Sequence, residues 1–243
     1  MADPTPRTRA VSTLVLEDPA GEAAERLAAA ARAGGQIALA GGSTPRAAYE
    51  RLAAMEVDWP ACTLWFGDER CVPPEDQRSN FRLVCEALLD RLTGPVPDVR
   101  RIMGERGPHE AADAYELELR QAFGEGMPRF DLVLLGLGPD AHCASLFPRQ
   151  PTLDERERLA VGVEQAGFAP WVPRVTLTLP AINAAHAVIF LVAGVDKAAA
   201  VERAFAHGPD HDAPASLVAP ESGALTVLID PLAAQRLQVR SHP

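Results

Sequence analysis

The sequence predicts an α/β protein built on a mainly parallel sheet flanked by helices. Short apolar segments typical of buried strands alternate with segments of helical periodicity, mostly across short connections. Residues that can bind anions or move protons gather directly after strands, at positions 41–45, 68–70, 140–142 and 194–197. Because the carboxyl ends of parallel strands meet at one edge of a sheet, this clustering predicts one composite site.

Hydrophobic pattern and breaker residues give the expected elements. Leu132–Leu135 is apolar throughout, as in a strand buried on both faces, whereas Arg174–Leu179 alternates apolar and polar residues. The expected strands are Val11–Leu16, Gln36–Ala40, Cys62–Phe66, Leu132–Leu135, Leu159–Val163, Arg174–Leu179, His186–Ala193, Ala215–Ala219 and Leu225–Asp230. The expected helices are Pro19–Ala33, Arg46–Met55, Asn80–Leu92, Pro108–Phe123 and 194–206.

Composition limits the class of protein. The chain has 243 residues, of which 47% are hydrophobic and 23% charged, and this excludes a mainly disordered chain. We find no interdomain linker, so residues 1–243 are expected to form a single α/β domain with a flexible tail at 1–10. No long heptad or exposed apolar helix face compels association, so we expect a monomer.

Charge and hydropathy argue against two kinds of partner. The formal net charge is -10 and no long basic run is present, so we expect neither a nucleic-acid nor an anionic-membrane partner. No stretch approaches the roughly 20 apolar residues that span a bilayer. The first ten residues lack the apolar region of a secretory signal, and we therefore expect a cytoplasmic protein.

The cysteines and the single lysine are informative by their placement. Cysteines occur at positions 62, 71, 85 and 143 without metal-type spacing, so we expect reduced thiols and no metal site. Lys197 is the one lysine among 23 basic residues. A site that needs a compact ammonium group would retain it, although chance retention gives the same pattern.

The stretch Phe130–Pro148, FDLVLLGLGPDAHCASLFP, organises the chain. Its buried strand ends at the turn residues Gly136, Gly138 and Pro139. Asp140 and His142 follow directly and are therefore expected at the carboxyl edge of the sheet. An acid and an imidazole at that edge predict a proton-transfer site. The alternative is a turn that carries a solvated Asp and His.

A second feature is the segment Gly41-Gly42-Ser43-Thr44-Pro45, which joins an expected strand to an expected helix. Two glycines allow a ligand to approach the backbone, and Ser43 or Thr44 can cap the helix. The exposed amides at the helix start then form an anion site. The alternative is a capped helix after a glycine turn. The next strand is followed by Asp68, Glu69 and Arg70. These residues are expected either to belong to the composite site or to form a charge cluster on the surface.

Five motifs in order resemble a known family. They are LAGGSTPRAAYERL (39–52), WFGDERCVPPEDQRSN (65–80), LGLGPDAHCASLFP (135–148), PRVTLTLPAIN (173–183) and GVDKAAAV (194–201). Together they resemble the glucosamine-6-phosphate isomerase/6-phosphogluconolactonase family over about residues 35–230, and side with its lactonase branch. The resemblance implies a Rossmann-like sheet, no cofactor, and hydrolysis of a small-molecule substrate, 6-phospho-D-glucono-1,5-lactone, in the oxidative pentose phosphate pathway.

The resemblance also implies roles for the catalytic group. His142 is expected to act as general base on a water molecule, because imidazole gains and loses a proton near neutral pH. Asp140 or Asp68 is expected to stabilise the imidazolium. Arg70 is expected to stabilise the developing oxyanion or to bind substrate.

The phosphate of the substrate needs a site for a dianion. In the pattern that resembles the family's phosphate site, its ligands are expected to be Gly41, Gly42, Ser43, Thr44, Arg174 and Lys197. The loop 164–173, EQAGFAPWVP, is apolar for a surface loop and is expected to line or cover the site.

Two departures from the family motif flank the expected base. Ala141 stands where family members have glycine, and Cys143 where they have threonine. A positive φ at position 141 would cost an alanine about 1 kcal/mol or more. Three alternatives stay open. The first is a glucosamine-6-phosphate deaminase or isomerase, although the acid that such an enzyme has after the residue corresponding to His142 is lacking. The others are a non-catalytic sugar-phosphate sensor and an esterase with Cys143 as nucleophile.

Overall fold

The computed structural model describes residues 11–237, and the tail expected at 1–10 lies outside this range. A seven-stranded sheet, parallel at every pairing, forms its centre in the order β1-β10-β9-β6-β2-β3-β5. Its strands are β1 (Val11–Val15), β2 (Gln36–Leu39), β3 (Thr63–Phe66), β5 (Asp98–Val99), β6 (Leu132–Leu135), β9 (Ala187–Val192) and β10 (Ala224–Ile229). The Rossmann-like, mainly parallel fold expected from the sequence is confirmed.

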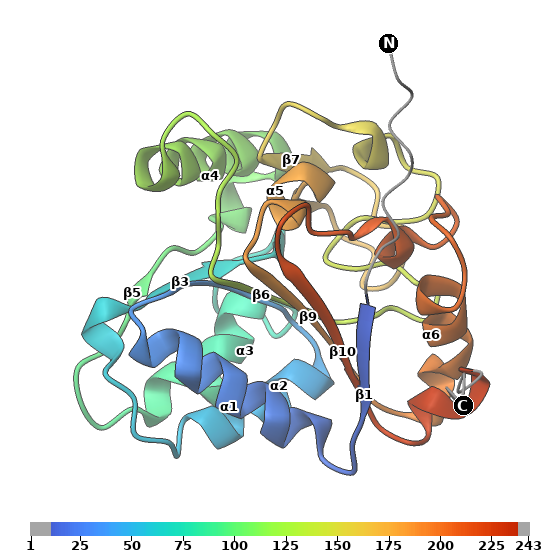
Figure 1. Cartoon of the computed structure of the whole chain (residues 1–243). Coiled ribbons are helices and arrows are strands. Elements are labelled where there is room, and N and C mark those ends of the chain that lie inside the picture. Colours follow the sequence, from blue (N-terminus) through green and yellow to red (C-terminus); the bar gives the residue numbers. More distant parts are fainter. Residues whose placement is uncertain (1–10, 238–243) are drawn as a thin grey trace.

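Helices lie on both faces of this sheet (Figure 1), with α1 and α2 on one side and α4 on the other. The helices are α1 (Pro19–Arg32), α2 (Ser43–Leu52), α3 (Asn80–Ala87), α4 (Pro108–Phe123), α5 (Leu179–Asn183) and α6 (Ala198–Phe205). None of the helices within residues 11–237 is long and apolar enough to cross a membrane. The chain runs from β2 to β3 on one side and from β6 to β9 on the other, in opposite directions across the sheet. A topological switch point therefore lies between the neighbouring strands β2 and β6.

A second, smaller sheet stands beside the main one and was not expected. It contains β4 (Asp68–Arg70), β8 (Arg174–Leu177) and β7 (Ala160–Val163), paired antiparallel in the order β4-β8-β7. The register sets Asp68 opposite Thr176 and Arg70 opposite Arg174. Strand pairing therefore brings together residues that lie about a hundred positions apart in the sequence.

The start of one helix and one expected strand differ from the sequence prediction. Helix α2 begins at Ser43, earlier than expected, because Gly42 rather than Ser43 or Thr44 is its N-cap residue. The prediction of a strand at Ala215–Ala219 is wrong, since a 3-10 helix, Pro214–Leu217, occupies this segment. The hydroxyl of Ser216 both accepts from the Asp210 amide and donates to its carbonyl, which closes a turn instead of pairing a strand.

Two buried tyrosines fix the carboxyl ends of neighbouring strands. The hydroxyl of Tyr49, on α2, donates to the Ala40 carbonyl at 2.7 Å and accepts from the Ala40 amide at 2.9 Å. The hydroxyl of Tyr115, on α4, does the same for Phe66, at 2.9 Å in both contacts. Both strand ends therefore have satisfied backbone groups where the chain leaves the sheet for the candidate site.

Candidate active site

A cavity of about 230 Å³ opens at the carboxyl ends of β2, β6 and β9 and beside the small sheet. Every site residue predicted from the sequence lines this cavity except Asp140, which contacts His142 behind it. The predicted residues that line it are Gly41, Gly42, Ser43, Thr44, Asp68, Arg70, His142, Arg174 and Lys197. The four clusters that follow strands in the sequence thus form one site, located where α/β sheets bind ligands.

The turn after β6 pairs the imidazole with its carboxylate. Nδ1 of His142 lies 2.5 Å from Oδ1 of Asp140, and the His142 amide donates to the same oxygen at 3.2 Å. Burial disfavours the Asp140 carboxylate, but contact with His142 outweighs it and holds the pKa of Asp140 below its usual value. With Nδ1 paired, Nε2 is the ring nitrogen left to accept or donate a proton.

The backbone of this turn explains two of its residues. A Cβ at Gly138 would stand 2.1 Å from Nδ1 of His142, so the imidazole can only pack here against a glycine. Ala141 has φ 66° and is fully buried, which places an L-residue in the left-handed region. The turn thus tolerates the Cβ of Ala141 at a cost in backbone strain.

Cys143 is buried and does not line the cavity. The thiol is therefore not presented to a substrate, and the esterase alternative with a Cys143 nucleophile loses its support. Burial also raises the pKa of Cys71 to about 11, which leaves this nearby thiol protonated at neutral pH.

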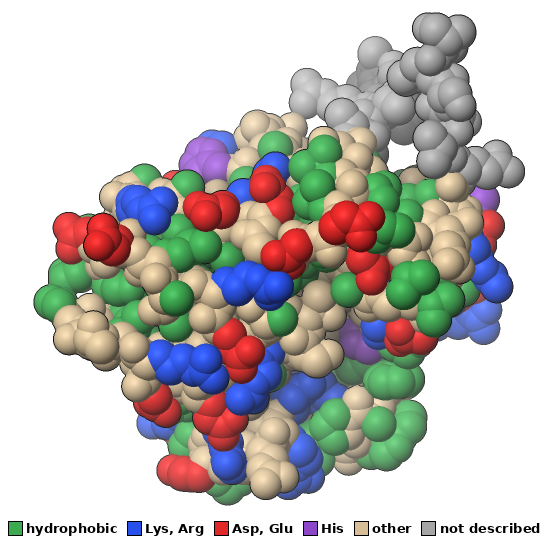
Figure 2. Space-filling view, turned by 90° about the horizontal axis from the view of Figure 1, so that it is seen from below, with side chains coloured by type: hydrophobic (Ala, Val, Ile, Leu, Met, Phe, Trp, Pro, Cys, Tyr) green, Lys and Arg blue, Asp and Glu red, His purple; other side chains and the backbone are tan. Residues whose placement is uncertain are grey.

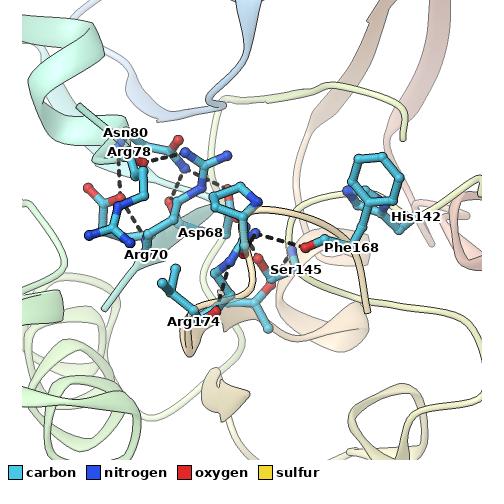
Figure 3. Close-up of polar contacts among 12 residues, drawn as sticks. Asp68, Arg70, Arg78, Asn80, His142, Ser145, Phe168 and Arg174 are labelled. Carbon is cyan, nitrogen blue, oxygen red and sulfur yellow. Dashed lines mark hydrogen bonds and ion pairs between the residues drawn. The ribbon is translucent and has the colours of Figure 1, made fainter. Parts of the chain in front are cut away.

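The second carboxylate, Asp68, has other partners. Its Oδ2 accepts from the Ser145 hydroxyl at 2.6 Å, and its Oδ1 accepts from Nδ2 of Asn80 at 3.0 Å (Figure 3). Nη1 of Arg174 lies 3.9 Å from Oδ2. Asp68 is thus held in a buried polar network, and the contact with His142 belongs to Asp140. Ser145 and Asn80 stood in the quoted motifs, but no sequence pattern indicated their role.

Arg70 faces the cavity from the edge of β4. Its Nη1 donates to the carbonyl of Arg78, which orients the guanidinium. The neighbouring Glu69 points the other way, into the protein, where it accepts from the amides of Asn80 at 2.7 Å and Phe81 at 2.8 Å. Glu69 therefore holds β4 against the start of α3, and alternation along the strand leaves Arg70 for the site.

The segment after β2 that was predicted to bind an anion leads into the start of α2 and lines the cavity. Gly42, at φ 108°, is the N-cap of α2 and has no side chain, and the first turn of the helix carries no acidic residue. The amides at the helix start consequently lack a capping acceptor from this residue, and they face the cavity with Ser43 and Thr44. Gly41 lies against Asn80, whose Oδ1 would be 1.9 Å from a Cβ.

Lys197 comes to the same cavity from the other side. It ends the 3-10 helix Val195–Lys197 after β9, and its nearest carboxylate, Asp196, lies 3.8 Å from Nζ. Many surface arginines are by contrast neutralised by close carboxylates, as Arg46 is by Glu86 at 3.1 Å. Figure 2 shows this mixture of basic and acidic side chains on one face. The ammonium charge of Lys197 is thus less closely paired than the guanidinium charge of Arg46.

Arg174 is nearly buried and mostly engaged by the loop before it. Nε donates to the Val172 carbonyl at 3.2 Å, and Nη2 donates to the carbonyls of Pro170 at 2.8 Å and Phe168 at 3.2 Å. Burial lowers the pKa of Arg174, against the opposing charge of Asp68. Phe168 and Ala169 line the cavity, which confirms that the apolar loop 164–173 lines the site.

Within residues 11–237 no group of three or more His, Cys, Asp or Glu side chains is placed to hold a metal ion. The site combines an imidazole paired with a carboxylate, a guanidinium and a helix start without a side-chain cap around one cavity. Such a set suits proton transfer on an anionic substrate.

Comparison with known proteins shows the family of the chain. Residues 11–227 match the family described as glucosamine-6-phosphate isomerases/6-phosphogluconolactonase. The chain belongs to this family. The human 6-phosphogluconolactonase is 42% identical over 217 residues, covering 87% of this chain and 84% of the relative. The 6-phosphogluconolactonase of Streptomyces coelicolor is 37% identical over 229 residues, covering 89% and 87%.

Two solved structures show the same fold. The 6-phosphogluconolactonase from Trypanosoma cruzi superposes with a TM-score of 0.83 at 28% identity, covering 95% of this chain and 98% of that one. A monomeric glucosamine-6-phosphate deaminase has a TM-score of 0.79 at 21% identity, covering 93% and 99%. The second similarity is one of fold alone.

Proposed function

We propose that this chain hydrolyses 6-phospho-D-glucono-1,5-lactone to 6-phospho-D-gluconate, a step of the oxidative pentose phosphate pathway. The observation that carries the proposal is the His142–Asp140 pair, 2.5 Å apart, in a cavity that also holds the uncapped start of α2 and Lys197. A base and an anion site in one cavity suit a phosphorylated lactone. The relatives named 6-phosphogluconolactonase support the same reaction.

The chemistry can be derived from the side chains. Nε2 of His142 takes a proton from water, and the resulting hydroxide attacks the lactone carbonyl carbon. Asp140 stabilises the imidazolium that forms. Arg70 stabilises the oxyanion of the tetrahedral intermediate, which then expels the ring oxygen, and that oxygen receives the proton held by His142. One water is thus added across the ester bond, and the carboxylic acid that forms loses its proton to solvent to give 6-phospho-D-gluconate.

The phosphate group is assigned to the other end of the cavity. The amides at the start of α2, the hydroxyls of Ser43 and Thr44, and the ammonium group of Lys197 supply donors and positive charge there. The sequence also assigned Arg174 to the phosphate. Its Nε and Nη2 donate to loop carbonyls, and within residues 11–237 its Nη1 makes no hydrogen bond.

The decisive experiment measures loss of freshly prepared lactone above its spontaneous rate. Purified protein is expected to accelerate hydrolysis, and His142→Ala to abolish most of the acceleration while its urea unfolding transition is kept. The matched control is His109→Ala, at an exposed histidine that pairs with Glu164 outside the cavity. No acceleration by the wild-type protein, or ammonia release from glucosamine 6-phosphate, would contradict the proposal. Ligand-induced stabilisation without turnover would favour the sensor.

The single-domain, monomeric organisation expected from the sequence stays a prediction. Light scattering checks it directly, with one 25.9 kDa species expected.

A further inference from the structure

The guanidinium of Arg174 is organised as a clamp on one loop. Its side chain is 4% exposed, and the three hydrogen bonds that it donates all end on carbonyls of the loop 164–173, those of Phe168, Pro170 and Val172. A planar fork with fixed directions can reach three backbone acceptors at once, whereas a lysine ammonium group on a flexible chain cannot take the same positions. The loop conformation thus depends on an arginine at position 174.

The clamped loop carries an aromatic ring to the candidate base. The ring centroid of Phe168 lies 5.8 Å from that of His142, and the ring of Phe147 lies 4.8 Å from it. Figure 3 shows Phe168 lying against His142 and Arg174 near the loop that bears it. The charged end of Arg174 also stands 5.9 Å from the Phe147 ring centroid. One arginine therefore touches both aromatic residues that pack on the imidazole.

Close packing makes this arrangement specific. A Cβ at Gly167 would stand 2.8 Å from Cβ of Phe147, so the loop can only approach Phe147 with a glycine at this point. The hydrogen bond to Asp140 fixes one edge of the His142 ring, but the ring can still rotate about this hydrogen bond. Only packing against neighbouring side chains limits that rotation. The rings of Phe147 and Phe168 supply that packing.

We propose that Arg174 is a positioning residue for His142, which acts by holding Phe168 against the imidazole, rather than a ligand of the substrate phosphate. Misplacing a catalytic group by about 1 Å can cost roughly 10²-fold in rate. Release of the loop is therefore expected to lower kcat without weakening the phosphate site. The expected change in kcat rests on the proposed hydrolysis, but the NMR signals of the His142 ring report its position whether or not the protein is a hydrolase.

The test compares Arg174→Lys and Arg174→Met with Lys197→Ala. Both Arg174 variants are expected to lower kcat about tenfold or more, with little change in KM or in the affinity for inorganic phosphate measured by calorimetry. Lys197→Ala is expected to do the reverse, because its charge belongs to the anion site. A phosphate-ligand role for Arg174 predicts instead that Arg174→Met weakens phosphate binding and that Arg174→Lys largely restores it, and that outcome would overturn the inference.

A second variant makes the test independent of how well the Arg174 variants fold. Phe168→Ala removes the ring and leaves Arg174 in place, so it is expected to lower kcat by a factor similar to that of Arg174→Lys. The double variant Phe168→Ala/Arg174→Lys is expected to lower kcat by no more than the larger of the two single effects. Full additivity of the two losses, or wild-type kcat in Phe168→Ala, would also overturn it. In both single variants the ring signals of His142 in NMR spectra are expected to shift or broaden, with or without turnover. Unchanged His142 signals in a folded Arg174→Lys protein would refute the positioning role.

Discussion

Oδ1 of Asp140 lies 2.5 Å from Nδ1 of His142, two residues further along the same turn. Asp68, the carboxylate that lines the cavity, is instead bound by Ser145 and Asn80. The two acids thus have different surroundings, and these separate their roles. Asp140 can respond to charge on the imidazole, while Asp68 joins the small antiparallel sheet to the turn after β6.

Asp140→Asn is expected to reduce kcat about 10²-fold, because an amide cannot stabilise the imidazolium by charge. The measurement is kcat against pH for the two proteins, together with Asp154→Asn, the same change at an exposed position outside the cavity. If Asp68→Asn altered the pH profile while Asp140→Asn left it intact, the partner of His142 would have to be Asp68.

The stability of the protein is expected to report the same contact. The folded-state pKa of Asp140 lies below its usual value, so the unfolded chain takes up a proton here at higher pH than the folded one. The stabilisation by ionised Asp140 is therefore present above the ordinary carboxyl pKa of about 3.9 and is lost as pH falls through the lower folded value.

Urea unfolding between pH 7 and pH 3.5 checks this expectation. The difference in unfolding free energy between wild type and Asp140→Asn is expected to be constant near neutrality and to shrink at the acidic end. Other carboxylates with lowered pKa, such as Glu105 beside Arg101, contribute equally to both proteins and cancel in the difference. A difference that stays constant down to pH 3.5 would show that Asp140 gains nothing from ionisation in the folded state.

The large sheet could be predicted from the sequence because its strands are short, apolar and closely followed by breaker residues. The site could be predicted for a related reason, since parallel strands bring the residues after their carboxyl ends to one edge of the sheet. The small sheet could not be predicted. β4 has three residues, and its partner β8 comes about a hundred positions later, so no local pattern records the pairing.

The roles of particular side chains were also beyond the sequence. Arg174 stands in a motif that suggests phosphate binding, but its Nε and Nη2 donate to carbonyls of the loop 164–173. Gly42 caps α2 in place of the hydroxyl residues that usually do so. Both outcomes depend on where a loop lies in three dimensions, which neither periodicity nor composition encodes.

Ala141→Gly is expected to stabilise the protein by about 0.5–1 kcal/mol. At φ 66° an alanine carries a strain of roughly 1–2 kcal/mol, and the greater freedom of glycine in the unfolded chain offsets part of the relief. Chemical denaturation of the variant and of Ala24→Gly, at a buried position in α1, provides the comparison. Ala24→Gly is expected to lose about 1 kcal/mol, as for glycine in a helix interior. Equal losses at both positions would mean that the turn after β6 stores no strain.

Tyr49→Phe is expected to destabilise the protein and to weaken phosphate binding together. The lost hydroxyl serves both backbone groups of Ala40, and leaving buried groups unpaired costs roughly 1–3 kcal/mol. Ala40 precedes Gly41 directly and lines the cavity, so its displacement moves the anion loop. Tyr115→Phe is the matched control, because it breaks the same pair of contacts at Phe66, the last residue of β3. Calorimetric titration with inorganic phosphate is expected to show a weaker affinity for Tyr49→Phe alone, while both variants unfold at lower urea. Equal weakening in the two variants would assign the effect to general destabilisation and not to the anion loop.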